Sequence, residues 1–443
     1  MKLWQKDIDS LKEVEKFTVG KDRELDVLLA RYDVLGSLAH IRMLESVGLL
    51  NKEELSALQT ALKKIYKEIE EGNFSLEEGV EDIHSQIEDM LTRQLGDAGK
   101  KIHAARSRND QVLVDLKLFL RNEIEDIVRR TQRLFELFQS KSETYKDALL
   151  PGYTHFQLAM PSSFGRWFGA YAESLADDIM AMYPAWVMAN KNPLGSAAGY
   201  GSSFPINRTL TTQLLGFTEL DHNVVYAQMG RGKVEKIFLQ GISNVAATLA
   251  KCAMDGCLFM NQNFGFISFP DELTTGSSIM PHKKNPDVLE LVRARCNQIQ
   301  SAPYVIQSML TNLPSGYHRD FQLIKEVVFP AISNLKDCLE MMHLMFSKVI
   351  VKKDILKDPK YLYLFTVEEM NKLVLKGTPL RDAYREIGKQ VAEGTFQSAA
   401  LLHHTHEGSA GNLHNREVAE MLQKNLQLFN FNEVNLALEK LIQ

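Results

Sequence analysis

Residues Leu113 to Phe138 read LVDLKLFLRNEIEDIVRRTQRLFELF, inside a segment without glycine or proline that runs from Lys100 to Leu150. Apolar side chains recur there in steps of three, four and seven, at Leu113, Leu116, Leu120, Ile124, Ile127, Leu134 and Phe138. This spacing places one apolar stripe along one face of a helix. The segment therefore predicts a very long α-helix that is buried on one side.

Three further runs have helical spacing, at 233–255, 287–302 and 331–358, the last of them beginning after Pro330. Strand-like segments between the runs are few and short. Patterns this long indicate a coiled coil, a membrane span or a bundle, but no strict heptad is kept and the apolar content is too low for a span. We expect a mainly α protein with a bundle of long helices at its core.

Glycines and prolines divide the chain into three predicted domains. An N-terminal helical domain covers 1–105, the central long-helix bundle covers 106–353, and a C-terminal helical domain covers 354–443. Apolar stripes of this length often need other subunits to cover them. We therefore expect a homo-oligomer.

The composition bounds the class of partner. The chain has 443 residues, a formal net charge of −5 and a pI near 6.2, so there is no electrostatic case for nucleic acid or a membrane surface. No apolar run approaches about 18 residues, and the start lacks the pattern of a signal peptide. The four cysteines form no C-x-x-C pair, which favours free thiols in a reducing compartment. We expect a cytoplasmic protein that acts on small molecules.

The segment TGSSIMPHKKNP, Thr275 to Pro286, is unusual in a helical chain. It can be read as a plain connection that ends where Asp287 enters the next helix. A connection, however, does not need paired serines, paired lysines and an asparagine. Serine, lysine and asparagine together suit the abstraction of a proton next to a carboxylate, on a loop that closes over its substrate.

Two other segments carry candidate side chains. PGYTHFQLAMPSSFGRWFGAYAE contains Thr154 and His155, although a lone histidine is more often structural than catalytic. ARSRNDQV opens the longest helix. Taken alone it favours a capped and solvated helix start over an anion site formed by Arg106, Arg108, Asn109 and the helix N-terminus.

Cofactor motifs are weak. The cluster HHTHE at 403–407 lacks the H-E-x-x-H spacing of a zinc site and is better read as a solvated loop. GRGKVE and GYGSSF lack the third glycine of a dinucleotide fingerprint and the end of a P-loop. We expect neither a metal nor a nucleotide cofactor.

The motifs taken together are specific. GSSIMPHKKNP resembles the signature of the fumarase/aspartase superfamily, whose members mostly cleave carbon–nitrogen or carbon–oxygen bonds by β-elimination and release fumarate. Within it the chain resembles the argininosuccinate lyase family. That resemblance rests on RSRNDQV, YTHFQLAMP, NPLGSAAGYGSSFPINR, LPSGYHRDFQLIKE, DRELDVLLARYDVLGSLAH and EDIHSQIE. It implies reversible cleavage of argininosuccinate to arginine and fumarate, without metal or organic cofactor.

The resemblance also implies roles for individual residues. Ser277 would be the base that takes a proton from the carbon next to the succinyl carboxylate. Lys283 and Asn285 would hold that carboxylate and stabilise the aci-carboxylate. His155, paired with Glu290, would help proton handling or departure of the leaving group.

Substrate binding is expected from two further groups of residues. The resemblance assigns the succinyl end of the substrate to Ser107, Asn109 and Thr154. It assigns the arginine end to Tyr317, Arg319, Gln322 and Lys325. It further implies a homotetramer in which each active site is assembled from three subunits.

Several positions depart from the family pattern. The segment FTVGKDR before the Asp–Arg pair is short and lacks a serine, Leu158 and Met160 replace arginine and glutamine, and His282 stands where glutamine is usual. These changes leave open a preference for another succinyl-amine, such as adenylosuccinate. A catalytically silent scaffold is the alternative from a different class.

Overall fold

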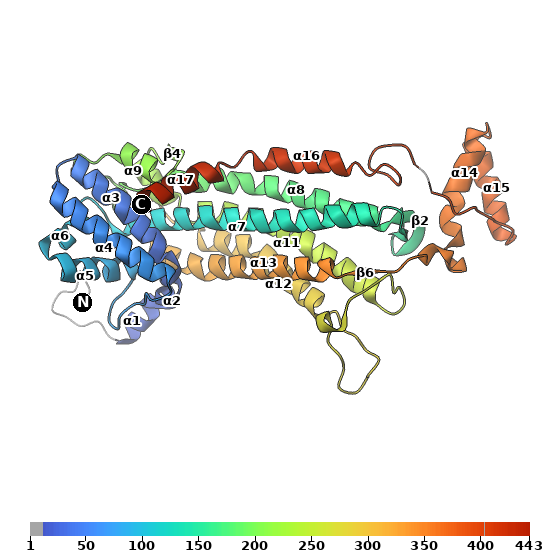
Figure 1. Cartoon of the computed structure of the whole chain (residues 1–443), viewed down its shortest axis with the longest axis horizontal. Coiled ribbons are helices and arrows are strands. Elements are labelled where there is room, and N and C mark those ends of the chain that lie inside the picture. Colours follow the sequence, from blue (N-terminus) through green and yellow to red (C-terminus); the bar gives the residue numbers. More distant parts are fainter. Residues whose placement is uncertain (1–11, 403) are drawn as a thin grey trace.

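The computed structural model describes residues 12–402 and 404–443. The chain is elongated, and five long helices lie side by side along its length (Figure 1). They are α7 (Arg108–Thr144), α8 (Phe164–Ala189), α11 (Lys233–Met260), α12 (Asp287–Met309) and α13 (Ile324–Ser347). With 37 residues, α7 is about 55 Å long. The predicted mainly α fold with a bundle of long helices is confirmed.

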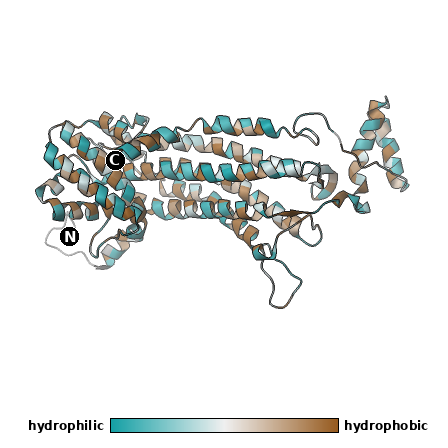
Figure 2. Cartoon of the chain, viewed as in Figure 1, coloured by the Kyte–Doolittle hydropathy of each residue, from teal (hydrophilic) through white to brown (hydrophobic). Residues whose placement is uncertain are grey.

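The predicted stripe of α7 faces the core. All seven of its apolar residues, Leu113 to Phe138 in the series above, are at most 4 % exposed. At its far end the ring of Phe138 packs against Phe168 of α8 at 5.8 Å and Phe346 of α13 at 5.4 Å between ring centroids. Figure 2 shows the mixture of hydrophobic and hydrophilic residues along each bundle helix.

The helix expected after Pro330 begins earlier than predicted. It is α13, which starts at Ile324, contains Pro330 and ends at Ser347. The proline removes the hydrogen bond that its amide would give to the carbonyl of Glu326. Burial of Ile324, Val328 and Phe329 on the first two turns offsets that loss, so packing overrides the local signal.

Small helices form one end of the molecule. They are α1 (Lys12–Val19), α2 (Asp22–Asp26), η1 (Val27–Leu29), α3 (Ala30–Ser46), α4 (Lys52–Glu70), α5 (Ile83–Leu95), α6 (Asp97–Lys100) and η2 (Lys101–His103). Two more, α9 (Arg208–Leu214) and α10 (Val224–Met229), lie in the α8–α11 connection. The first described turn of α7 therefore lies where the N-terminal helices meet the bundle.

Beyond residue 353 the chain has two parts. After η5 (Ile355–Lys357) and η6 (Pro359–Phe365), helices α14 (Thr366–Leu375) and α15 (Leu380–Ala392) stand beyond the far end of the bundle (Figure 1). The chain then returns, because α16 (Asn415–Leu426) packs along α8 and α17 (Phe431–Ile442) packs on α3 and α9. Only α14 and α15 thus stand apart from the bundle within the predicted domain 354–443. The three-domain division stays a prediction.

The strands are short. An antiparallel hairpin pairs β1 (Leu149–Thr154) with β2 (Gln157–Ser163). The other pairs are β3 (Lys191–Asn192) with β4 (Glu219–Leu220) and β5 (Ile267–Ser268) with β6 (Ile350–Val351). A 3-10 turn, η3 (Asp271–Leu273), precedes the loop 275–286, and η4 (Arg319–Leu323) precedes α13.

One helix of the described chain, α11, is long and apolar enough to cross a membrane by length and composition alone. In the bundle, 61 % of its most apolar window is buried. It packs against α8, α12 and α13. Its apolar character is accounted for by its place in the core.

Candidate active site

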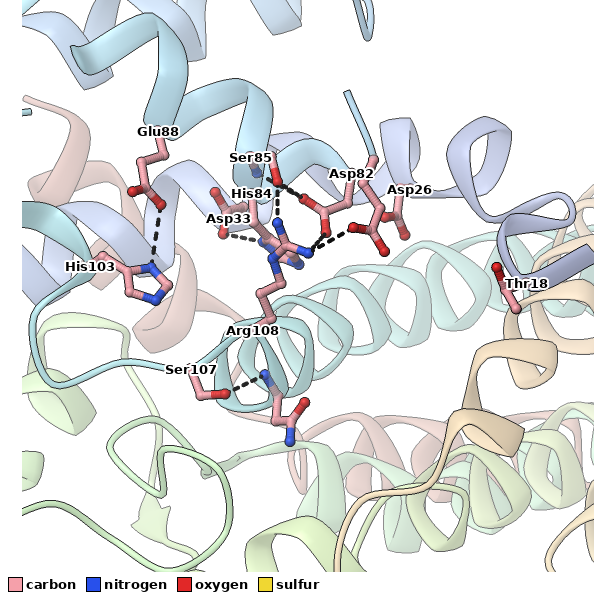
Figure 3. Close-up of polar contacts among 12 residues, drawn as sticks. Thr18, Asp26, Asp33, Asp82, His84, Ser85, Glu88, His103, Ser107 and Arg108 are labelled. Carbon is pink, nitrogen blue, oxygen red and sulfur yellow. Dashed lines mark hydrogen bonds and ion pairs between the residues drawn. The ribbon is translucent and has the colours of Figure 1, made fainter. Parts of the chain in front are cut away.

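The start of α7 is built by a capping box. Ser107 Oγ accepts a hydrogen bond from the Asn109 amide at 3.3 Å, and Asp110 Oδ1 accepts one from the Ser107 amide at 2.8 Å. Figure 3 shows Ser107 beside the N-terminal turn. The predicted capped helix start is confirmed, and it fixes the direction in which the side chain of Asn109 points away from the helix.

Asp110 also holds a loop from elsewhere in the chain. Its second oxygen, Oδ2, accepts hydrogen bonds from the amides of Gly195 and Ala197, both at 3.0 Å. Gly195 and Ala197 both have positive φ, so this loop is bent tightly around the carboxylate. The motifs RSRND and PLGSAAG are therefore one structural unit.

The two arginines of ARSRND point into the N-terminal helices. Arg108 contacts Glu81 Oε2 at 3.1 Å, Asp82 Oδ2 at 3.2 Å and the hydroxyl of Ser85 (Figure 3). Arg106 donates to Ser37 Oγ at 2.9 Å. Both guanidinium groups are thus engaged by the protein, and Asn109 is left to face the neighbouring cavity.

A cavity of about 530 Å³ opens beside this helix start. It is lined by five of the predicted binding residues, Asn109, Tyr317, Arg319, Gln322 and Lys325. Segments more than 200 residues apart in sequence therefore meet within one chain, and the substrate-binding roles of these residues stay predictions. Ser107, the N-cap of α7, is not among the lining residues.

Sequence reasoning missed most of the charged lining. Asp22, Asp26, Glu81, Asp82, His84 and Arg231 line the same cavity, as does Arg108, which was considered only for an anion site. Five of them lie in the motifs DRELD and EDIHSQIE, which carry the family resemblance but have no local feature that distinguishes these charges from solvated surface charge. Besides His84, the ionisable lining comprises four acidic and four basic residues.

Several of these side chains already have partners. Lys325 is 2 % exposed and pairs with Asp22 and Asp26. Burial and the nearby Asp26 raise the pKa of Asp22, although Lys325 opposes them. Arg319 and Gln322 donate to the Thr18 carbonyl at 3.0 and 2.9 Å, so they also hold the end of α1 against the cavity. Their roles toward a substrate stay predictions.

The loop 275–286 protrudes from the bundle before α12 (Figure 1). Its neck is closed by backbone hydrogen bonds between Thr275 and Asn285, at 3.3 and 2.8 Å. Inside the loop, Ser277 Oγ accepts from the amides of Ile279 at 3.4 Å and Met280 at 3.1 Å. Lys283 has no ion pair with any residue that the structure describes, which leaves its charge for a ligand.

His155 lies at the tip of the β1–β2 hairpin. Thr154 pairs with Gln157, so His155 and Phe156 form a two-residue turn with φ of 52° and 57°. Such turns favour asparagine and glycine, and two larger residues there indicate strain of the kind found at functional sites. Phe156 is 85 % exposed. Within the described chain, no hydrogen bond or ion pair joins His155 to Glu290.

A second cavity, of about 700 Å³, lies under this hairpin between α8, α11 and the start of α16. His155 is the predicted site residue among its lining, which also includes Trp167, Asp255 and Phe259. The side chains that donate to Asp255 are Trp167, at 2.9 Å, and Tyr171, at 2.7 Å.

The predicted site residues thus fall into separate places within one chain. Ser277, Lys283 and Asn285 precede α12, whereas Tyr317 and Arg319 follow it. The 23 residues of α12 span about 35 Å, so its two ends cannot touch one small substrate. Figure 1 shows the loop and the N-terminal helices well apart.

Comparison with known proteins agrees with this architecture. A family model described as a lyase matches residues 7–301. A solved structure of EDDS lyase in complex with formate has a TM-score of 0.80 and 20 % identity, and covers 98 % of this chain and 95 % of that one. The bundle and its protruding loop therefore define a lyase of the fumarase/aspartase type.

Closer relatives identify the family within that class. Argininosuccinate lyase of Bacteroides fragilis is 58 % identical over 430 residues, which are 97 % of this chain and 96 % of the relative. Argininosuccinate lyase of Parabacteroides distasonis is 58 % identical over 441 residues, 100 % of this chain and 99 % of the relative. The chain belongs to the argininosuccinate lyase family.

Proposed function

We propose that this protein is a carbon–nitrogen lyase that reversibly cleaves argininosuccinate to L-arginine and fumarate, a step of arginine biosynthesis. The observation that carries this proposal is the 58 % identity to argininosuccinate lyases along essentially the whole chain. The departures Leu158, Met160 and His282 do not prevent that match. They lie on the hairpin and the protruding loop.

The loop supplies the elimination chemistry. A serine hydroxyl is a weak base until its oxygen is stabilised as an alkoxide. Two backbone amides already point at Ser277 Oγ, at 3.4 and 3.1 Å, and can stabilise that charge. Lys283 and Asn285 then hold the succinyl carboxylate, whose second negative charge develops as the proton leaves. His155 is the candidate for protonating the leaving guanidino nitrogen.

The N-terminal cavity suits the rest of the substrate. Argininosuccinate carries carboxylates, an amino group and a guanidinium group, so it needs a lining of both signs. Arg231, Arg319 and Lys325 supply cations, and Asp22, Glu81 and Asp82 supply carboxylates. Asn109 and Tyr317 add uncharged hydrogen-bonding groups between them.

We infer that complete sites form only in a homotetramer. The loop and the cavity lie at opposite ends of α12, so a second subunit must bring the missing half. Bundle helices also carry large exposed apolar side chains that a partner would cover, namely Met180, Val187, Leu291, Tyr304 and Val305. The free cysteines support a cytoplasmic location.

Fumarate release tests the activity directly. Purified protein is given argininosuccinate or, separately, adenylosuccinate, and fumarate is followed by its ultraviolet absorbance. Release from argininosuccinate alone is the expected result. Release from adenylosuccinate alone, or from neither with the oligomer intact, would contradict the proposal.

A further inference from the structure

The larger of the two cavities has a lining that the proposed elimination does not use. It lies under the β1–β2 hairpin, at the end of the bundle where β2 is labelled (Figure 1). Its volume of about 700 Å³ is that of a small-molecule site. Of the residues predicted to act in catalysis or substrate binding, His155 alone lines it. The rest of its lining is therefore available for another ligand.

Four ionisable side chains line this cavity. They are His155 of the hairpin turn, Arg166 and Glu173 of α8, and Asp255 of α11. Arg166, Glu173 and Asp255 form no ion pair with any residue that the structure describes. Three charges around one cavity thus lack partners. Because two of the three are negative, the lining favours a ligand with a net positive charge.

The carboxylate of Asp255 is held in place with one oxygen free. The Trp167 indole at 2.9 Å and the Tyr171 hydroxyl at 2.7 Å both donate to Oδ2. Burial, with smaller effects of Cys252 and Asp255, raises the pKa of Tyr171, so its hydroxyl keeps the proton that it donates. Oδ1 has no donor in the described chain and is not among its fully buried orphan oxygens. It is therefore open to an N–H donor of a ligand.

The three charges follow one another along α8. Arg166 and Glu173 are seven residues apart, which is two turns or about 10 Å along the axis, and they lie on one side of the helix. The Asp255 carboxylate lies between their levels, because it accepts from Trp167 and Tyr171. The cavity thus presents one cation followed by two carboxylates. An α-amino acid with a basic side chain has the complementary order of carboxylate, ammonium and side-chain cation.

Aromatic rings form a wall beside these charges. Trp167 and Phe259 lie 5.2 Å apart between ring centroids, and Tyr153 and Phe264 lie 5.5 Å apart. All four rings line the cavity. Such a wall covers the methylene groups of a long side chain, and its ring faces attract a cation.

We propose that this cavity binds a free basic amino acid, with L-arginine as the best match. The ligand carboxylate pairs with Arg166, and its ammonium group donates to Asp255 Oδ1. Its side-chain cation pairs with Glu173, whose two oxygens have no partner in the described chain. A guanidinium group can bind both oxygens at once, whereas an ammonium group is a point charge.

The position of the cavity connects this ligand to turnover. His155 and Phe156 of the hairpin turn line it, so a bound ligand holds the turn in one conformation. L-arginine is a product of the proposed reaction, and its binding here lowers turnover as product accumulates. This regulatory effect rests on the proposed function, whereas the binding site does not.

Equilibrium dialysis of radiolabelled L-arginine against the assembled protein tests the site. We expect the wild type to bind about one L-arginine per chain more than the double variant Arg166→Gln/Glu173→Gln. The two lost ion pairs should weaken the site by about 100-fold. Neither side chain is buried, so the variant should fold. L-arginine held in the N-terminal cavity cancels in this difference, which therefore does not depend on the proposed function.

Two competitors and one variant define the chemistry of the site. Agmatine lacks the carboxylate and L-citrulline has an uncharged side chain, so each should compete at least about 10-fold less well than L-arginine. Asp177→Asn removes an exposed carboxylate of α8 that does not line the cavity, and it should keep the additional L-arginine. Equal binding by the wild type and the double variant, equal competition by L-citrulline, or a loss in Asp177→Asn overturns the proposal.

The regulatory effect has its own readout. Added L-arginine should lower kcat for fumarate release in the wild type but not in the double variant, whose kcat without L-arginine should be unchanged. An equal fall of kcat in both proteins overturns this effect. If neither protein releases fumarate, the proposed function fails, and the dialysis still decides whether the site exists.

Discussion

The side-chain oxygen of Ser277 accepts a hydrogen bond from the backbone amide of Met280 at 3.1 Å. This contact is made inside an exposed loop, where no buried group requires it for stability. Two amides directed at one hydroxyl oxygen favour its deprotonated form. The arrangement matches a base that must carry negative charge before the reaction.

Ser277→Ala should therefore abolish turnover and leave the fold intact. We expect kcat to fall by at least about 1,000-fold, because the base is lost, with an unchanged gel-filtration profile. The neighbouring Ser278→Ala is the matched control and should keep most activity. Near-normal turnover in Ser277→Ala, or a collapse in Ser278→Ala alone, would move the base to another residue.

The variant His155→Asn removes the imidazole but keeps the backbone conformation of the turn. Asparagine tolerates the left-handed backbone at this position, so the hairpin should fold normally. We expect kcat to fall by about 10²-fold to 10⁴-fold, the usual contribution of a general acid or base. The measurement is kcat against pH, with circular dichroism as the check on folding.

Phe156→Gly is the companion variant for the hairpin. It relieves the second left-handed residue and leaves His155 in place. Its activity should stay within a few-fold of wild type. A large loss in this variant would show that Phe156, and not His155, is the functional residue of the turn.

The parts of the fold that were predictable are those with local signals. The stripe from Leu113 to Phe138 predicts α7 because successive buried residues lie one or two helical turns apart. The start of α13 was predicted too late because proline was taken to begin the helix. In the structure Pro330 lies inside α13, where the burial of Val328 and Phe329 outweighs the cost of the proline. The β1–β2 hairpin gave no turn signal, because His155 and Phe156 stand where asparagine and glycine are usual.

Only those residues of the site that belong to recognisable sequence motifs could be predicted. Asn109, Tyr317, Gln322 and Lys325 were named from their motifs, and they do line one cavity. The carboxylates Asp22, Asp26 and Glu81 were not, since nothing local distinguishes them from solvated surface charge. Only the tertiary fold brings them opposite Lys325 and Arg319.

Mixing two inactive variants tests whether sites are shared between subunits. Asn109→Ala alters the cavity and Ser277→Ala alters the loop, and these two places lie beyond opposite ends of α12. The Asn109 side chain makes no hydrogen bond within the described chain, so its loss should not harm folding. After joint unfolding and reassembly, hybrid oligomers should contain some sites with neither change and regain part of the fumarate-releasing activity.

The control mixture combines two changes from the same loop. Ser277→Ala with Lys283→Ala should recover nothing, because every site receives one defective loop. Recovery in this control, or none in the Asn109 and Ser277 mixture despite verified hybrids, would show that the loop and the cavity act within one chain.

The Asp178 carboxyl group of α8 makes stability depend on pH away from the active site. It is 7 % exposed and its Oδ2 has no hydrogen-bond donor in the described chain. Burial, with a smaller effect of Asp177, raises its pKa to about 6, although Thr248 opposes this by a hydrogen bond. The unfolded carboxyl ionises near its ordinary value of 3.8, so the native state holds more protons between about pH 4 and pH 6.

The free energy of unfolding should therefore fall as the pH rises through that window. Asp178→Asn removes the charge, keeps an oxygen for Thr248, and should stabilise the protein by about 1–2 kcal/mol at pH 7 and by nearly nothing at pH 4. Urea unfolding at the two pH values measures both differences. Exposed Asp177→Asn should change stability by less than about 0.5 kcal/mol at pH 7. A destabilised Asp178→Asn at pH 7 would mean that the charged carboxylate has a partner, which a neighbouring subunit would have to supply.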